Sequence, residues 1–199
     1  MQHDFILLDR SGSMSTRWTE AVGSVNAYVE ELAKKSVDTG VTLAVFDTGS
    51  FEVIRDRIAP STWKAVEVTE VSPRGGTPLN DSTAKLLDLA EKGNYDKVAI
   101  IIMTDGAENA SREYSTAAIK KRLDTVRAKG WQVIFLGADF ENQAQASSLG
   151  NLAGQTIMAS AANMAGTMRH TASLRAAYGV SGQAMSYSDE DKRKAKGSL

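Results

Sequence analysis

Three oxygen-bearing side chains at alternate positions stand near the start of the sequence: Asp9, Ser11 and Ser13. They follow the apolar run of residues 5–8, which is typical of a buried strand. The three side chains therefore lie on the turn where the chain leaves that strand, and all can point to one side of it. A carboxylate and two hydroxyls are hard oxygen ligands, so this turn could bind a hard cation such as Mg²⁺. The same residues could instead cap the helix that follows.

A second carboxylate follows the most apolar stretch of the chain. Residues 98–103 show no polar alternation, which predicts a central parallel strand covered on both faces, and Asp105 comes just after its end. If this strand lies beside the first one, Asp9 and Asp105 face one crevice and repel, and a divalent cation resolves the repulsion. Thr77 offers a further hydroxyl from a loop whose two glycines allow close approach of the backbone. It could alternatively cap the helix that begins at Pro78.

The remaining pattern predicts strands that alternate with helices. Such alternation favours a doubly wound, mostly parallel sheet with helices on both faces, in which ligands bind beyond the carboxyl ends of the strands at the switch in strand order. A short turn predicts that one antiparallel edge strand forms a hairpin. The expected strands span residues 3–8, 41–46, 51–55, 98–103, 131–136 and 155–158, and the expected helices 18–35, 78–92, 119–129, 142–149 and 161–178.

Composition and charge limit the classes of protein that fit. The 199 residues suit a single domain, predicted at 1–178, followed by a polar tail at 179–199 that we expect to be flexible and solvated. A formal net charge of −1 gives no electrostatic reason to expect nucleic acid or a membrane as partner. The chain has no cysteine, so disulfides, thiolate metal sites and a cysteine nucleophile are excluded. Because no leader or membrane-spanning run is visible, the sequence predicts a cytoplasmic protein.

The spacing of the polar residues resembles that of the von Willebrand factor type A (VWA) domain, over residues 4–178. Asp9, Ser11, Ser13, Thr77 within Gly-Gly-Thr-Pro and Asp105 within Thr-Asp-Gly match the five positions of that family's metal-ion-dependent adhesion site. The resemblance implies a six-stranded, Rossmann-like domain. It also implies a divalent cation, Mg²⁺ foremost with Mn²⁺ or Ca²⁺ as alternatives, whose open position takes a Glu or Asp carboxylate from a partner protein.

The function expected from this resemblance is metal-dependent protein–protein interaction, without catalysis, within an intracellular multiprotein assembly. Residues expected to form the rim of the site are Arg10, Met14, Arg17, Arg74, Glu108 and Asn109. The alternative is a Mg²⁺-dependent hydrolase or phosphoryl-transfer enzyme on the same kind of fold, although the chain has no phosphate-binding loop and no Gly-x-Ser-x-Gly motif. His3 and His170 are expected to be structural or surface residues, and Asp47 to serve the hairpin turn.

Overall fold

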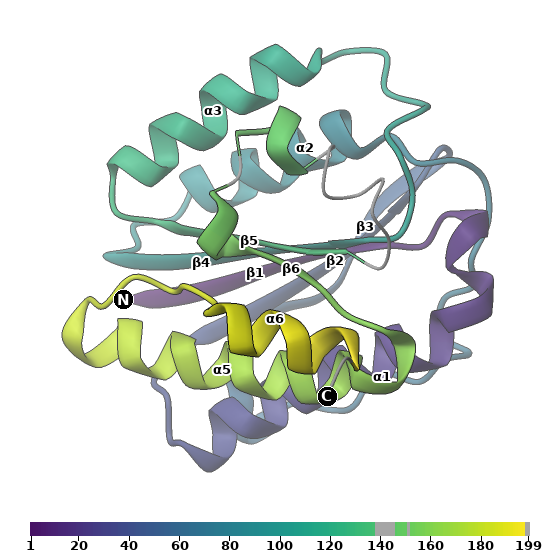
Figure 1. Ribbon diagram of the computed structural model, residues 1–199. Coiled ribbons are helices and arrows are strands. Elements are labelled where there is room, and N and C mark those ends of the chain that lie inside the picture. Colours follow the sequence, from purple (N-terminus) through teal and green to yellow (C-terminus); the bar gives the residue numbers. More distant parts are fainter. Residues whose placement is uncertain (138–145, 151, 198–199) are drawn as a thin grey trace.

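The computed structural model describes residues 1–137, 146–150 and 152–197, which contain one sheet of six strands between two layers of helices (Figure 1). The strand order is β3-β2-β1-β4-β5-β6. Neighbouring strands are parallel except β2 and β3, which form the antiparallel edge hairpin. The doubly wound sheet and its edge hairpin predicted from the sequence are therefore confirmed. The strands are β1 (Gln2–Asp9), β2 (Gly40–Asp47), β3 (Ser50–Ile58), β4 (Lys97–Thr104), β5 (Gln132–Gly137) and β6 (Thr156–Met158).

The helices form two layers, with α1, α5 and α6 on one face of the sheet and α2 and α3 on the other (Figure 1). The first half of the predicted helix at 142–149, residues 142–145, lies outside the described part of the chain; of the other positions, 146–148 are helical. The helices are α1 (Trp18–Lys34), α2 (Leu79–Glu91), α3 (Thr116–Ala128), α5 (Met164–Ser181) and α6 (Asp189–Lys196), with short 3-10 helices η1 (Gly12–Arg17), η2 (Pro60–Thr62), η3 (Ala153–Gln155) and η4 (Ala161–Asn163).

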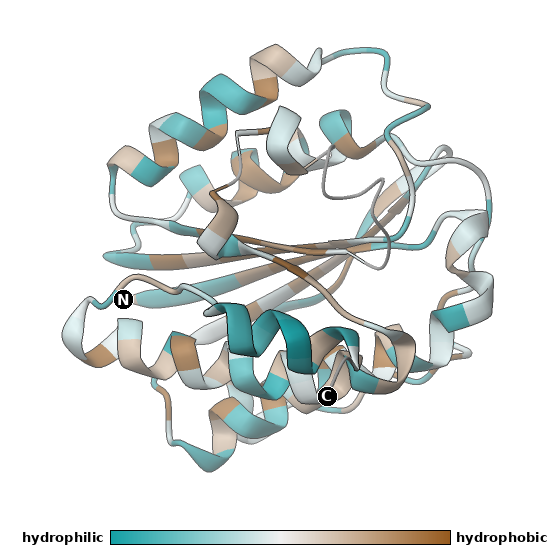
Figure 2. Ribbon diagram, in the orientation of Figure 1, coloured by the Kyte–Doolittle hydropathy of each residue, from teal (hydrophilic) through white to brown (hydrophobic). Residues whose placement is uncertain are grey.

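Both faces of the sheet are buried, which explains the unbroken apolar runs. Along β1, Phe5 and Leu7 join the apolar cluster on the α2 and α3 side, whereas Ile6 and Leu8 join the cluster beneath α1 and α5. The colouring in Figure 2 shows hydrophobic residues concentrated on the strands and on the inner sides of the helices. A strand covered on both sides has no face that needs polar residues, so the chemistry is confined to its ends.

The strand order brings the ends of β1 and β4 together. From β1 the chain crosses through α1 to β2 on one side, and it later returns through α2 to β4 on the other side of β1. In the parallel β1–β4 pair, Leu8 lies opposite Met103, so Asp9 and Asp105 emerge at the same edge. The switch point of the sheet, where ligand sites of such folds lie, is therefore at these two aspartates.

At the opposite end of β1 a buried ion pair fastens the helical layer to the sheet. The Arg175 side chain of α5 donates to Asp4, and both side chains are fully buried. Tyr28 of α1 donates its hydroxyl to the same carboxylate at 2.9 Å, and Thr39 donates to it at 3.3 Å. Burial opposes a charged Arg175, but the adjacent Asp4 carboxylate keeps the pKa of Arg175 above its ordinary value.

The C-terminal tail differs from the solvated, flexible segment expected from its composition. Its last helix, α6, begins with a capping box between Ser188 and Asp191, and Figure 2 shows α6 as strongly hydrophilic. Met185, Tyr187 and Ala195 are nevertheless buried in the core cluster beneath α1 and α5. These apolar side chains anchor the tail, and its acidic first turn and basic last turn suit the helix dipole.

Candidate metal centre

The turn after β1 is arranged around the Asp9 carboxylate, whose residue is fully buried. One carboxylate oxygen of Asp9 accepts the Ser11 backbone N–H at 2.7 Å, and the other accepts the Thr104 hydroxyl at 2.6 Å. The Ser11 and Ser13 hydroxyls lie 3.1 Å apart. Ser11 occupies the N-cap position of η1 without a capping hydrogen bond from its side chain. The two serine hydroxyls therefore face one another instead of capping a helix.

Side chains from three separate loops converge next to this turn. The Ser13 hydroxyl donates to Asp105 Oδ1 at 2.7 Å. A Cβ atom placed on Gly106 would lie 2.8 Å from Thr77 Oγ1, 3.3 Å from Ser13 Oγ and 3.7 Å from Asp9 Oδ2. These oxygens therefore surround one small volume that a glycine keeps free of side chain.

The Thr77 hydroxyl is not used as a helix cap. Helix α2 begins at Leu79 with Pro78 at its N-cap position, and its first backbone N–H groups, those of Asn80 and Asp81, donate to the side chains of Glu108 and Ser111. Thr77 therefore does not cap this helix, which was the alternative role considered for it. Its hydroxyl lies instead beside the volume next to Gly106.

The electrostatics of the site favour a cation. Burial raises the pKa of Asp9 to about 6, against hydrogen bonds from Thr104 and Ser11 that lower it, and the charge of Asp105 raises it further. The Nε atom of Arg17 lies 3.3 Å from Asp105 Oδ2, and the Arg17 side chain is 23% exposed. This partly exposed arginine contacts Asp105, whereas the recorded partners of the Asp9 carboxylate are neutral donors.

The donor set fits a hard divalent cation. Asp9, Ser11, Ser13, Thr77 and Asp105 supply only carboxylate and hydroxyl oxygen, the ligands that Mg²⁺ and Ca²⁺ prefer. Among the described residues there is no cluster of three or more His, Cys, Asp or Glu side chains that could hold a metal. A metal at this position would therefore depend on the neutral hydroxyls, which leave much of its charge uncompensated.

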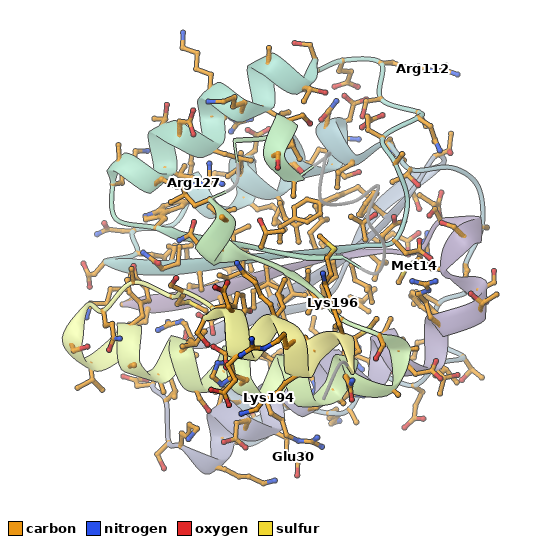
Figure 3. The ribbon with its side chains drawn as sticks, viewed as in Figure 1. Met14, Glu30, Arg112, Arg127, Lys194 and Lys196 are labelled. Atoms are coloured by element: carbon orange, nitrogen blue, oxygen red, sulfur yellow. The ribbon has the colours of Figure 1, made fainter. Side chains whose placement is uncertain are left out.

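Two residues expected at the rim are buried. Arg10 is 3% exposed and Met14 is 2% exposed. The Arg10 Nε donates to Asp47 Oδ2 at 2.7 Å, and its Nη2 donates to Glu52 at 2.7 Å. Met14 packs into the core on the inner side of η1 (Figure 3). Neither side chain is therefore presented to a partner, because the hairpin carboxylates hold Arg10 and the apolar core takes Met14.

The other residues expected at the rim make contacts with the loops of the site, and their rim role stays a prediction. Arg74 is exposed and donates to Asp47 at 2.9 Å. Glu108 accepts the Asn80 backbone N–H at 2.7 Å, at the start of α2, and Asn109 Oδ1 accepts the Thr77 backbone N–H at 2.9 Å. Thr48 also touches the Thr77 loop, a role that sequence reasoning missed because its turn indicates only a hairpin.

The chain belongs to the von Willebrand factor type A domain family, whose sequence pattern it matches over residues 5–171. No curated protein sequence matches it significantly. The identification rests on the family match and on the six-stranded fold described above. Domains of this family are generally adhesion or protein-interaction modules.

Solved structures with the same fold include several VWA domains and pilus proteins. The VWA domain of the type V pili tip protein Mfa5 from Porphyromonas gingivalis has a TM-score of 0.69 and 12% identity, covering 86% of this chain and 94% of that one. The PilB minor pilin from Streptococcus sanguinis has a TM-score of 0.62 and 14% identity, covering 88% and 60%. Manganese-loaded TRAP from Plasmodium vivax has a TM-score of 0.61 and 18% identity, covering 83% and 71%. At these low sequence identities the likeness shows that the fold is shared, and it shows nothing beyond the fold.

The prediction of a cytoplasmic location is wrong in the light of these neighbours. They include a pilus tip protein, a minor pilin and a pilus adhesin, which are components of surface structures. The prediction relied on missing features, namely cysteines and a leader, and such features do not determine a compartment. The described part of the chain likewise contains no helix with the length and apolarity needed to span a bilayer.

Proposed function

We propose that this domain binds a divalent cation and presents it to an acidic residue of a partner protein. The ligands are Asp9, Ser11, Ser13, Thr77 and Asp105, and Mg²⁺ is the favoured metal, with Mn²⁺ and Ca²⁺ as alternatives. The observation that carries the proposal is the convergence of Thr77 Oγ1, Ser13 Oγ and Asp9 Oδ2 around one point beside Gly106. The manganese-loaded neighbour with the same fold gives further support.

The carboxylates and the hydroxyls have different roles in the proposed site. Asp9 and Asp105 supply the negative charge that attracts a cation, while the serine and threonine hydroxyls complete an oxygen shell without cancelling its charge. The remaining charge suits a carboxylate from outside. Asp9 is held in place by Ser11 and Thr104, so its orientation is set before any ligand arrives.

Metal binding is tested by thermal unfolding of the wild type and of Asp9→Ala, with Mg²⁺ or Mn²⁺ and with a chelator. A ligand that binds only the folded state raises the unfolding temperature, so we expect a rise in the wild type and none in Asp9→Ala. Asp38→Ala, at an exposed aspartate, is the matched control and should respond like the wild type. A wild type that ignores both metals would overturn the proposed site.

Recognition of a carboxylate is tested with an array of peptides that contain Glu or Asp, paired with the same peptides carrying Gln or Asn. Wild-type protein with Mn²⁺ should retain a subset of the acidic peptides only. Chelation and Asp9→Ala should each abolish that retention. Equal retention of the amide versions would show that the cation does not receive a carboxylate.

The enzyme alternative has little support around the site. His3 lies at the opposite end of β1 and contacts Thr42 at 2.9 Å, and His170 on α5 pairs with Asp191 at 3.2 Å. Neither imidazole is therefore near Asp9 to act as a base. Metal-dependent hydrolysis of para-nitrophenyl phosphate that disappears in Asp9→Ala would reverse this conclusion.

A further inference from the structure

The loop that carries Thr77 is held from two sides by residues that are not metal ligands. On one side the Thr48 hydroxyl oxygen accepts the Gly76 backbone N–H at 2.6 Å. On the other side Asn109 Oδ1 accepts the Thr77 N–H at 2.9 Å, and the Asn109 N–H donates to the Thr77 carbonyl at 3.1 Å. Three hydrogen bonds thus fix two consecutive residues of this loop.

Gly76 is enclosed so tightly that no side chain fits there. A Cβ atom at this position would lie 2.8 Å from Asn109 Oδ1 and 3.1 Å from Thr48 Oγ1. Real Cβ atoms rarely approach other atoms so closely. The loop therefore passes between the two polar side chains with only its backbone in the gap.

The Thr48 side of this arrangement is anchored by a cluster of charges. Asp47 accepts the Gly49 N–H at 2.6 Å, which shapes the turn that carries Thr48. The same carboxylate receives Arg10 from the turn after β1 and Arg74 from the loop before Thr77. Asp47 thereby connects the hairpin turn to both loops that hold candidate ligands.

The Asn109 side is anchored on the start of α2. Glu108 accepts the backbone N–H groups of Asn80, Ala110 and Ser111. Asp81, in the first turn of α2, accepts three N–H groups of the same loop, those of Arg112, Glu113 and Tyr114. The backbone on either side of Asn109 is therefore fixed to a helix, so its amide is a rigid support.

The two loops that carry ligands are also joined directly. The Arg74 N–H donates to the Arg10 carbonyl at 2.8 Å, and the Gly12 N–H donates to the Gly75 carbonyl at 3.0 Å. Any displacement of the Thr77 loop would therefore pull on the turn that holds Ser11 and Ser13. The position of one loop sets the position of the other.

We propose that Thr48 and Asn109 are positioning residues that fix the Thr77 hydroxyl for metal binding, an inference that rests on the function proposed above. Both residues are exposed, so their loss should leave the core intact. Their effect appears in the affinity for the metal, because a loose loop must be ordered at the moment of binding.

The test is the Mn²⁺ affinity of the full chain, measured by isothermal titration calorimetry. Thr48→Val and Asn109→Ala should each weaken binding by about tenfold or more, the usual effect of losing a group that orients a ligand. Thr48→Ser, which retains a hydroxyl acceptor, should restore wild-type affinity. Thr62→Val is the matched control, since that hydroxyl donates to the Ala59 carbonyl within an exposed turn, and it should bind like the wild type.

The possible outcomes separate this inference from the proposed function. A wild type that binds no Mn²⁺ overturns the metal site itself. A wild type that binds, together with Thr48→Val and Asn109→Ala variants of equal affinity, overturns the positioning role and leaves the metal site standing. Metal-free variants that melt at lower temperature but bind Mn²⁺ with unchanged affinity would show a purely structural role, and this also overturns the inference.

Discussion

The two ends of strand β1 each carry a buried aspartate, and the two carboxylates have different kinds of partner. Asp4 and Asp9 are both fully buried. Asp4 is paired with the guanidinium of Arg175 and also receives the hydroxyls of Tyr28 and Thr39. Asp9 receives only neutral donors, the Ser11 N–H and the Thr104 hydroxyl, in the part of the chain that the structure describes.

If the proposed function holds, this difference separates a structural aspartate from a functional one within the eight residues of one strand. A buried carboxylate needs a compensating positive charge or it takes up a proton. At Asp4 the protein supplies that charge permanently, so the ion pair fastens α5 to the sheet. At Asp9 the neutral donors hold the geometry, and under the proposed function the compensating charge comes from a cation in solution.

Arg175→Met should have the largest effect, because it leaves Asp4 buried without its partner. We expect a loss of about 3–5 kcal/mol in the free energy of unfolding, measured by urea denaturation. Arg169→Met, at an exposed position of the same helix, should change stability by less than about 0.5 kcal/mol. Adding Asp4→Asn to Arg175→Met should recover part of the loss. Equal stability of Arg175→Met and wild type would contradict a structural role for this end.

His3, next to Asp4, should give the second largest effect through pH. Burial lowers the pKa of His3 from 6.5 to about 4; Asp56 opposes this, and Arg57 and Arg175 add to it. The unfolded chain takes up this proton near pH 6.5, whereas the folded chain resists until about pH 4. The contribution to stability is therefore complete above pH 6.5 and is lost as pH falls towards 4. Its full size is about 3 kcal/mol.

The measurement is urea unfolding of wild type and His3→Gln across that pH range. Asp9 acts with the opposite sign, because a raised pKa makes its contribution disappear as pH rises from 3.8 to about 6. The difference between wild type and variant at each pH isolates the histidine. Parallel pH profiles for the two proteins would show that His3 titrates normally.

Asp9→Asn should have a smaller effect, opposite in direction to that of Arg175→Met. Without metal, the substitution removes a buried negative charge that has no ion-pair partner among the described residues, so we expect a gain of about 1–2 kcal/mol in unfolding free energy with chelator present. Asp4→Asn is the matched comparison and should lose stability, because it leaves the buried guanidinium of Arg175 without its carboxylate partner. Destabilisation by both substitutions would erase the contrast between the two ends.

Arg17→Met should have the smallest effect. Under the proposed function the Arg17 guanidinium would compete with the metal for Asp105, through a contact at 3.3 Å whose arginine side chain is partly exposed. Its removal should tighten Mn²⁺ binding by about two- to fivefold, the scale of one such ion pair. Arg55→Met, which breaks a pair with Glu70 on the edge hairpin, should leave the affinity unchanged. Weaker binding by Arg17→Met would instead make Arg17 part of the site.

Much of the fold was predictable because local and long-range signals agree. The apolar run at 98–103 is buried on both faces in β4, and the turn at 47–50 forms the expected hairpin. The site residues were predictable as a group, since a strand order with one switch point brings the ends of β1 and β4 together. Their ligand role remains a prediction that the metal experiments test.

What the sequence could not reveal depends on contacts between distant segments. The sequence predicts that Arg10 is an exposed rim residue. In the structure its guanidinium instead donates to Asp47, thirty-seven positions later in the chain. The tail appears disordered by composition, yet isolated apolar residues such as Met185 and Tyr187 are enough to dock it. The spacing of Ser188 and Asp191 is that of a capping box and could have predicted the start of α6. The neighbouring runs of charged residues instead favoured a solvated tail.

The charge cluster of Arg10, Asp47, Glu52 and Arg74 has a consequence for how a partner arrives. Two positive and two negative side chains lie within contact of one another, so their fields largely cancel beyond the cluster. They neither attract nor repel an acidic partner at a distance. Encounter with such a partner would then be governed by short-range capture at the metal, and its association rate should vary only weakly with ionic strength.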